Sequence, residues 1–333
     1  GRSYRWKTDL AADEYADGVA KNLYLIGHGD PKILSENLWR LIDDARVAGL
    51  KKVAGDLVID DSHFTGPFMA PGFNDKDQDS AYRAATGAVS LNFNSVVIQV
   101  EPGRRVGEPL EVLLRPDSGH IELINESSTT SRGRERVQVS ARKSGDATRI
   151  VVKGRMPLTH RGLAVRRRID NPPRYAGAAA RLFLERAGIT ISGKVRVGKA
   201  PTRRRRLARL WSPNLVQVIA DVNQYSNNFM AEHLVRTMGA EHGSAGDWKS
   251  GRPVVEGFLR DQVGMNQFRY INGSGLFGDT AFSGGDMVKL LRFMQEQPEQ
   301  PEFVASLAIN GIAGTLRRRL KKLAPGTVRA KTG

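Results

Sequence analysis

The 333-residue sequence contains no cysteine, which excludes disulfide bonds, cysteine-ligated zinc and thiol catalysis. It also lacks any apolar run that approaches the length needed to cross a bilayer. Aromatic residues make up only 7% of the chain and hydrophobic residues 40%, and these values are typical of a globular protein. The absence of thiols is compatible with an oxidising compartment, although many cytosolic proteins share it.

The sequence has fewer acidic than basic residues, with 35 Asp and Glu and 51 Lys and Arg, and its formal net charge is +16. The basic residues form runs at 166–168, 203–206 and 317–322. Such runs indicate either attraction to a polyanion (nucleic acid, lipid headgroups or an anionic cell wall) or a solvated basic surface. No aromatic residues interleave the runs as stacking platforms for bases would, so we favour a solvated surface.

A chain of this length predicts two or three domains. In its first half, strands are expected at 4–10, 22–26, 53–59 and 91–100, with a turn at Asp17-Gly18. Helical periodicity predicts a helix over 34–50, and its apolar face comprises Leu38, Leu41, Ile42, Ala45 and Ala48. Short alternating segments over 105–156, separated by turn residues, indicate a small all-β module.

The second half is expected to be mainly helical. Helices are predicted at 176–187, at 228–238 with Gly239 as its end, and at 286–295. Ser212-Pro213 has the pattern of a further helix start. Residues 64–79 are predicted to form a loop, 189–197 a strand, and 328–333 an extended segment.

Two short motifs far apart in the sequence form a candidate site. Ser226 and Asn228 are expected in a short break between two helices, where a hydroxyl can relay a proton and an amide can hold a peptide bond. Helix capping is the alternative for both residues. Lys331, Thr332 and Gly333 follow an extended segment, and offer a positive charge, a hydroxyl and close backbone approach to a substrate carboxylate or peptide.

Other patterns are interpreted as structural. Asn272 to Leu276 form a glycine-rich turn without the surroundings of a nucleophile elbow or a phosphate loop. Ser140 and Lys143 match Ser-x-x-Lys by spelling, but alternation predicts a strand, which would point them to opposite faces. His233 and His242 lack a third ligand in register, so they are expected to be surface residues and no metal site is predicted.

Together these motifs resemble the class C low-molecular-mass penicillin-binding proteins, which are D-alanyl-D-alanine carboxypeptidase/endopeptidases. Ser-x-Asn and Lys-Thr-Gly are two of the three signatures of such serine enzymes. The resemblance covers nearly the whole chain and rests on segments in the family's order. These are 4–6, 22–31, 55–60, 226–228, 272–276, 311–316 and 328–333.

The resemblance implies an α+β multidomain fold, in which a penicillin-binding, serine β-lactamase-like catalytic domain carries an insertion with a nested β-rich module. Residues 1–105 are expected to form the first part of the insertion domain, with a remnant of the catalytic domain at the start. The nested module is expected at 106–157, the second part of the insertion at 158–200, and a C-terminally incomplete catalytic domain at 201–333.

The resemblance also implies a serine-type enzyme that cleaves peptidoglycan stem peptides through an acyl-enzyme and is inhibited by β-lactams. Ser226, Asn228 and Lys331 would be catalytic, whereas Thr332, Gly333 and Asp77 would bind substrate, with Asp77 holding the side-chain amine of diaminopimelate. The nucleophile, its base and a signal peptide are expected upstream of residue 1, so the fragment alone is expected to be inactive, and the protein is expected in the periplasm or cell envelope. No metal, organic cofactor or nucleic acid is implied. The alternatives are a noncatalytic cell-wall-binding protein on the same fold and a charge-driven polyanion binder.

Overall fold

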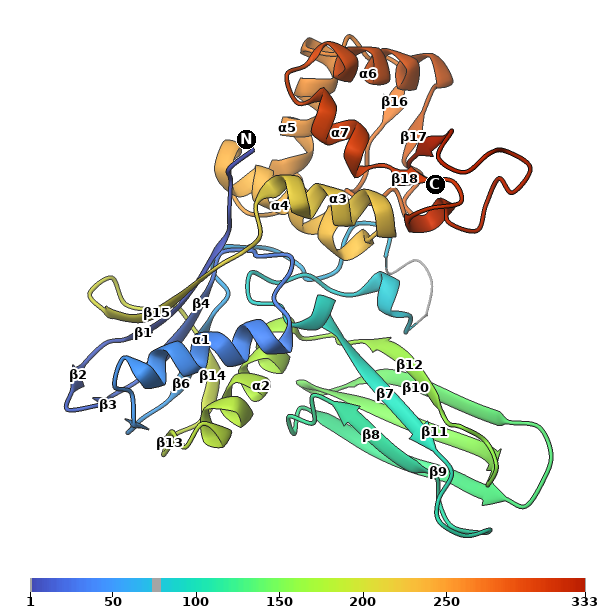
Figure 1. The fold of residues 1–333 in the computed structure, drawn as a ribbon. Coiled ribbons are helices and arrows are strands. Elements are labelled where there is room, and N and C mark those ends of the chain that lie inside the picture. The colour runs from blue at the N-terminus through green and yellow to red at the C-terminus, as the bar shows by residue number, and fades with distance from the viewer. Residues whose placement is uncertain (1, 74–78, 333) are drawn as a thin grey trace.

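A five-stranded sheet with two helices on one face organises the first part of the chain (Figure 1). The computed structural model describes residues 2–73 and 79–332. Helices α1 (Ser35–Val47) and α2 (Pro172–Arg186) contact each other and pack on the sheet, and their apolar faces contribute to its core. The strands, in spatial order, are β14 (Val195–Val197), β6 (Leu57–Asp60), β4 (Leu23–Gly27), β1 (Lys7–Ala12) and β15 (Arg205–Trp211).

The helix expected over 34–50 is confirmed, and Leu38, Leu41, Ile42 and Ala45 are buried as predicted. Ala48 is exposed, because the helix ends at Val47 and Ala48 is its cap. The turn at Asp17-Gly18 is also confirmed, with φ of 52° and 86°, the pair of positive values that a tight hairpin turn requires. It joins two strands of a small second sheet, whose members are β13 (Thr190–Ile191), β5 (Lys52–Val53), β3 (Val19–Ala20) and β2 (Tyr15–Ala16).

The expected β-rich region consists of two three-stranded sheets. One has the order β12 (Leu163–Arg168), β7 (Ser95–Glu101), β8 (Glu111–Arg115), and the other β10 (Arg136–Ser144), β11 (Ala147–Pro157), β9 (Ile121–Thr130). Alternate residues of the strands point inward, since Val96, Ile98 and Val100 of β7 are fully buried. The strands therefore extend beyond 106–157 on both sides, while the domain boundaries themselves stay a prediction.

Helices dominate the remaining part of the chain. They are α3 (Leu215–Tyr225), α4 (Asn228–His242), α5 (Trp248–Asp261), α6 (Gly284–Glu296) and α7 (Gln300–Ser306). Two short ribbons lie among them, β16 (Phe268–Arg269) with β17 (Ala281–Phe282) and β18 (Ala308–Ile309) with β19 (Arg329–Ala330). Single 3₁₀ turns occur at η1 (Ala81–Arg83), η2 (Asn92–Asn94) and η3 (Gly314–Leu316). The sheets and helices together give the mixed α+β fold that was predicted.

Three predicted helix boundaries are wrong, and one is the start of α2, which begins at Pro172 rather than at 176 because the Asn171 side chain caps it. Asn214, and not Ser212, caps α3, because the Ser212 hydroxyl already accepts the backbone N–H of Trp6 at 2.9 Å. Helix α4 continues past Gly239 to His242. A Cβ at Gly239 would lie 2.5 Å from the carbonyl oxygen of Ala245, so this glycine permits close packing of the segment that leads into α5.

The N-terminal segment joins the first sheet to the helical part. Trp6 is buried, and its indole N–H donates to the Thr237 hydroxyl of α4 at 3.0 Å. The backbone N–H of Leu215, at the start of α3, donates to the carbonyl oxygen of Tyr4. In the described part of the chain, no helix combines the length and the apolar character needed to cross a bilayer.

Candidate active site

The joint between α3 and α4 presents two side chains that take no part in capping. Ser226 ends α3 in the left-handed conformation, with φ of 53°, and Asn228 is the first residue of α4. The cap of α4 is Asn227, whose side chain accepts the backbone N–H of Met230 at 3.1 Å. The break between two helices is therefore confirmed, and the side chain that caps the start of α4 belongs to the residue between the two candidates.

The hydroxyl of Ser226 lies against the ammonium of Lys331. Lys331 Nζ donates to Ser226 Oγ at 2.7 Å, although the two residues lie 105 positions apart in the chain. Loss of hydration lowers the pKa of Lys331 below its ordinary value. A lysine with a lowered pKa, in direct contact with a hydroxyl, can take part in proton transfer through that hydroxyl.

Lys331 is held in place by the short ribbon that precedes it. Ala308 and Ile309 of β18 pair with β19 in antiparallel register, which confirms an extended segment before Lys331. The turn η3 brings this ribbon against the end of α3. At Gly314, where φ is 64°, a Cβ would lie 2.7 Å from the carbonyl oxygen of Gln224, so the approach requires glycine.

Thr332 is positioned by a residue that the sequence reasoning missed. The hydroxyl of Thr332 donates to the Thr315 hydroxyl at 2.9 Å. Thr315 belongs to η3, in the segment 311–316 whose order supported the family resemblance. That segment was the available signal, because Thr315 directly follows Gly314 and is placed by the same turn.

Asn228 faces another part of the chain. Its amide nitrogen donates to the carbonyl oxygen of Tyr82 at 3.1 Å, so it joins α4 to the segment after the 64–79 loop. The structure thus brings Ser226 and Lys331 into direct contact and places Asn228 two residues away on the same joint. Asp77 and Gly333, the other two predicted site residues, lie outside the described residues.

The turn at 272–276 is held by a buried carboxylate that sequence reasoning also missed. Glu232 of α4 has no exposed surface, and it accepts the backbone N–H groups of Gly273 at 3.0 Å and Ser274 at 2.8 Å. It also accepts the indole N–H of Trp248 at 2.8 Å. Burial raises the pKa of Glu232, while these hydrogen bonds oppose the rise. Residues 272–276 therefore form a turn, as predicted, and the carboxylate of Glu232 holds it in place.

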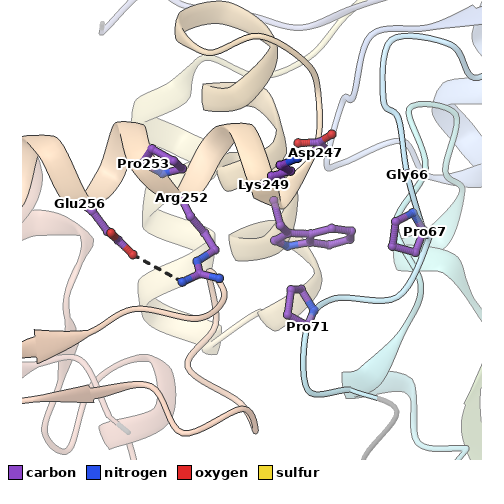
Figure 2. Close-up of a pocket in the computed structure, with 9 residues that line it drawn as sticks. Gly66, Pro67, Pro71, Asp247, Lys249, Arg252, Pro253 and Glu256 are labelled. Carbon is purple, nitrogen blue, oxygen red and sulfur yellow. Dashed lines mark ion pairs between the residues drawn. The ribbon is translucent and has the colours of Figure 1, made fainter.

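The same turn fixes the segment that precedes Asp77. Asn272 is fully buried, and its amide nitrogen donates to the carbonyl oxygen of Pro71 at 2.8 Å. On the far side of Pro71 a cavity of about 560 Å³ opens between this segment and α5 (Figure 2). An ion pair of 3.5 Å between Arg252 and Glu256 lies along its wall. Pro71 is therefore held by the hydrogen bond from Asn272 on one side and lines the cavity on the other.

The prediction for His233 is wrong, because this residue is completely buried rather than on the surface. Its two ring nitrogens lie 3.0 Å from the carbonyl oxygen of Phe229 and 3.1 Å from that of Gly87. Burial lowers its pKa to about 3. Both nitrogens are occupied by backbone oxygens, so the side chain ties α4 to the 84–91 segment. His242 is exposed, as predicted.

Comparison with known proteins supplies relatives for the whole chain. The model of the D-Ala-D-Ala carboxypeptidase 3 (S13) family matches residues 1–333. The chain is 30% identical to a D-alanyl-D-alanine carboxypeptidase of Actinomadura sp. (strain R39), over 100% of this chain and 65% of that protein. It is 22% identical to the D-alanyl-D-alanine carboxypeptidase DacB of Haemophilus influenzae, over 94% of this chain and 66% of that protein. The chain thus spans just under two thirds of the length of these curated relatives.

The fold is also similar to solved structures. A crystal structure of penicillin binding protein 4 (dacB) from Haemophilus influenzae aligns with a TM-score of 0.83, at 21% identity, over 99% of this chain and 73% of that one. A structure of the same protein complexed with a β-lactam aligns with a TM-score of 0.74, at 20% identity, over 96% and 70% of the chains. The predicted penicillin-binding fold is thereby confirmed.

Proposed function

The chain belongs to the D-Ala-D-Ala carboxypeptidase 3 (S13) family, and from this premise we propose that the natural protein is a serine-type D-Ala-D-Ala carboxypeptidase/endopeptidase. Its substrates are peptidoglycan stem peptides. The observation that supports the proposal most directly is the 2.7 Å contact between Lys331 Nζ and Ser226 Oγ, because it unites the two motifs that such an enzyme needs at one place.

The proposed reaction proceeds through an acyl-enzyme. A serine hydroxyl attacks the carbonyl carbon of the D-Ala-D-Ala bond and loses its proton to a lysine, which acts as base. The C–N bond then breaks, and the leaving amine of D-Ala takes up a proton. Water hydrolyses the resulting ester and restores the serine hydroxyl. We propose that this serine and lysine belong to a Ser-x-x-Lys sequence outside residues 1–333, since the curated relatives are longer than this chain.

Each residue of the candidate site has a distinct function in this proposal. Ser226 relays the proton to the leaving amine, and Lys331 supports that transfer and attracts the substrate carboxylate. Thr332 donates a hydrogen bond to the same carboxylate, and Asn228 holds the peptide bond of the substrate. Gly333 allows close approach of the substrate backbone, and Asp77 holds the amino group of the diaminopimelate side chain.

The proposal extends to inhibition and location. A β-lactam would acylate the same serine as the substrate, and a relative of the same fold has been crystallised with a β-lactam. A signal peptide would direct the protein to the periplasm or cell envelope, where its substrate is found. We further propose the nested arrangement of domains, in which the strands β7 to β12 form the innermost module.

The test uses the natural protein that contains this chain. We expect stoichiometric covalent labelling by a fluorescent penicillin and release of D-Ala from a pentapeptide ending in D-Ala-D-Ala, with Ser226→Ala losing release. A noncatalytic cell-wall-binding protein would sediment with purified peptidoglycan but show neither labelling nor release. That result would exclude the enzyme and leave the alternative of a binding protein on the same fold.

A further inference from the structure

An exposed basic segment lies between η3 and β19, and residues 317–323 are here named the basic loop. Its five cations are Arg317, Arg318, Arg319, Lys321 and Lys322, all of them exposed. Among residues 2–73 and 79–332, none of the five has an ion-pair partner. Residues 303–333 contain no Asp or Glu, so these cations have no acidic neighbour in this stretch of the sequence. The loop therefore carries a concentrated positive field.

Aliphatic side chains are exposed among these cations. The exposed fractions are 55% for Ile312, 46% for Leu320 and 48% for Leu323. Leu320 also has a left-handed backbone, with φ of 54°, which is unfavourable for a leucine. The packing of Leu320 against the rest of the chain does not offset this backbone strain, because nearly half of the residue is exposed. Strained residues of this kind often occur at functional sites.

The basic loop projects from a firmly held base. Asn310 is buried, its amide nitrogen donates to the carbonyl oxygen of Ala324 at 2.9 Å, and its side-chain oxygen accepts the N–H of Val328 at 2.8 Å. The N–H of Gly326 donates to the Asn310 carbonyl oxygen at 3.0 Å. In Figure 1 this dark-red loop extends outward near the C-terminus, away from the helices.

We propose that the basic loop docks on an anionic lipid bilayer. The cations would meet the headgroup phosphates, and Leu320 and Leu323 would enter the boundary between headgroups and acyl chains, with Ile312 beside them. A soluble polyanion offers counter-charges but no apolar phase, so the exposed leucines favour a lipid surface over a nucleic acid or a charged polymer. This inference is independent of the proposed catalytic function.

The position of the basic loop determines which part of the protein would face the bilayer. Lys331 and Thr332 come directly after β19, and Val328, the residue before β19, donates its N–H to Asn310 at the base of the loop. A bilayer bound to the basic loop would therefore lie beside the candidate site rather than at the β-rich strands β7 to β12. Docking would bring the site close to material that is assembled at the membrane surface.

The test is vesicle co-sedimentation of the natural protein. Vesicles of phosphatidylcholine with about a third phosphatidylglycerol are compared with pure phosphatidylcholine, at low and high salt. Two variants are compared with wild type, Arg317→Glu/Arg318→Glu and Leu320→Asn/Leu323→Ser; asparagine tolerates the left-handed backbone at 320. The matched control is Arg203→Glu/Arg204→Glu, which reverses two exposed cations in a different basic run. Retention on immobilised polyphosphate reports binding to a soluble polyanion.

We expect wild type to bind only the anionic vesicles and to be released by salt. Arg317→Glu/Arg318→Glu should weaken vesicle partitioning at least about tenfold, and more than the control does, since each cation near an anionic surface contributes about a fivefold factor. Leu320→Asn/Leu323→Ser should lose vesicle binding but keep its retention on polyphosphate. Unchanged vesicle binding by the leucine variant, equal losses in the control, or no binding by wild type would overturn the proposal.

Discussion

The ammonium of Lys331 donates a hydrogen bond to the hydroxyl of Ser226 at 2.7 Å, and no other contact in the described chain joins the two halves of the candidate site so directly. Ser226 lies at the end of a helix, and Lys331 follows a two-residue strand. Their distance is set by the packing of η3 on α3. The site is therefore as stable as this packing, and its chemistry can be tested separately from its assembly.

Ser226→Ala in the natural protein should lower turnover by roughly 10²–10⁴-fold, because a proton relay is lost. Ser226→Gly should lower turnover equally and leave stability unchanged or improved, since glycine accepts a φ of 53° without strain. Release of D-Ala and thermal melting measure the two effects.

The neighbouring Asn227→Ala serves as the control. It removes the cap of α4 and should cost about 1 kcal/mol of stability while the reacting groups remain in place. If Ser226→Ala melted at a lower temperature but kept its turnover, Ser226 would be a structural residue of the joint and not a relay.

The polypeptide of residues 1–333 should not form a covalent adduct with a labelled penicillin. Ser140 and Lys143 are the spelling match to Ser-x-x-Lys, and they lie on β10, where residues three apart face opposite sides of the sheet. Gel fluorescence after boiling, with the natural protein as the positive control, makes the measurement. A stoichiometric label on 1–333 would require a nucleophile within these residues, and mass spectrometry would locate it.

Asp77→Ala should impair substrates whose side chain ends in a free amine and spare those whose amine is acetylated. The electrostatic reason is that a carboxylate on a chain of net charge +16 is a local site for an ammonium group. A charge-assisted hydrogen bond contributes about 1.5–3 kcal/mol, so kcat/KM should fall roughly ten- to a hundredfold on the free amine only. Equal losses on both substrates would show that Asp77 is not the partner of the amine, and Asp79→Ala is the control.

Patterns within a few residues predicted many helices and turns of this molecule. They failed for polar residues that are buried by contacts with distant parts of the chain. The helix α1 and the Asp17-Gly18 turn were predictable because their apolar period and their turn residues act within a few positions. Glu232, His233 and Arg236 belong to α4, where three polar residues in one turn resemble a solvated face. All three are buried, because loops far away in sequence supply their partners. Arg236, for example, donates to the carbonyl oxygen of Thr86.

The candidate site shows the same division. Ser226 and Lys331 were predictable as members of two known motifs, but their direct contact is seen only in the structure. Thr315 was missed because its position depends on the close approach of η3 to α3, which no local pattern encodes. Ser212 was assigned to a cap it does not make, since Trp6 competes for its hydroxyl from the opposite end of the chain.

The stability of the protein should fall below pH 6.5 in a way that depends on His233. Burial lowers its folded pKa from 6.5 to about 3, so the unfolded chain takes up a proton that the folded chain does not. Its stabilising contribution is complete above pH 6.5 and is lost as the pH falls towards 3. The difference in unfolding free energy between wild type and His233→Gln should shrink by about 2 kcal/mol between pH 7 and pH 5.

Urea denaturation at each pH measures this difference, and His242→Gln on the same helix is the control. His242 is exposed, so its replacement removes a histidine from the same helix without opening a buried site. A constant difference between wild type and His233→Gln across this range would mean that the folded state protonates His233 as easily as the unfolded state does.

Gly314→Ala should disturb the site without touching any reacting group. A Cβ at this position would meet the carbonyl oxygen of Gln224 at 2.7 Å, and the φ of 64° adds a cost of about 1–2 kcal/mol for alanine. Because Thr315 follows directly and contacts Thr332, η3 cannot move without shifting Lys331 and its neighbour away from Ser226. Both kcat/KM for D-Ala release and the rate of penicillin labelling should fall about tenfold or more.

Gly284→Ala is the control, because a Cβ there would meet no atom within 4 Å, and it should leave both rates unchanged. If Gly314→Ala lowered the melting temperature but left both rates intact, the pairing of β18 with β19 would suffice to hold Lys331, and the packing of η3 on α3 would not be needed for the site.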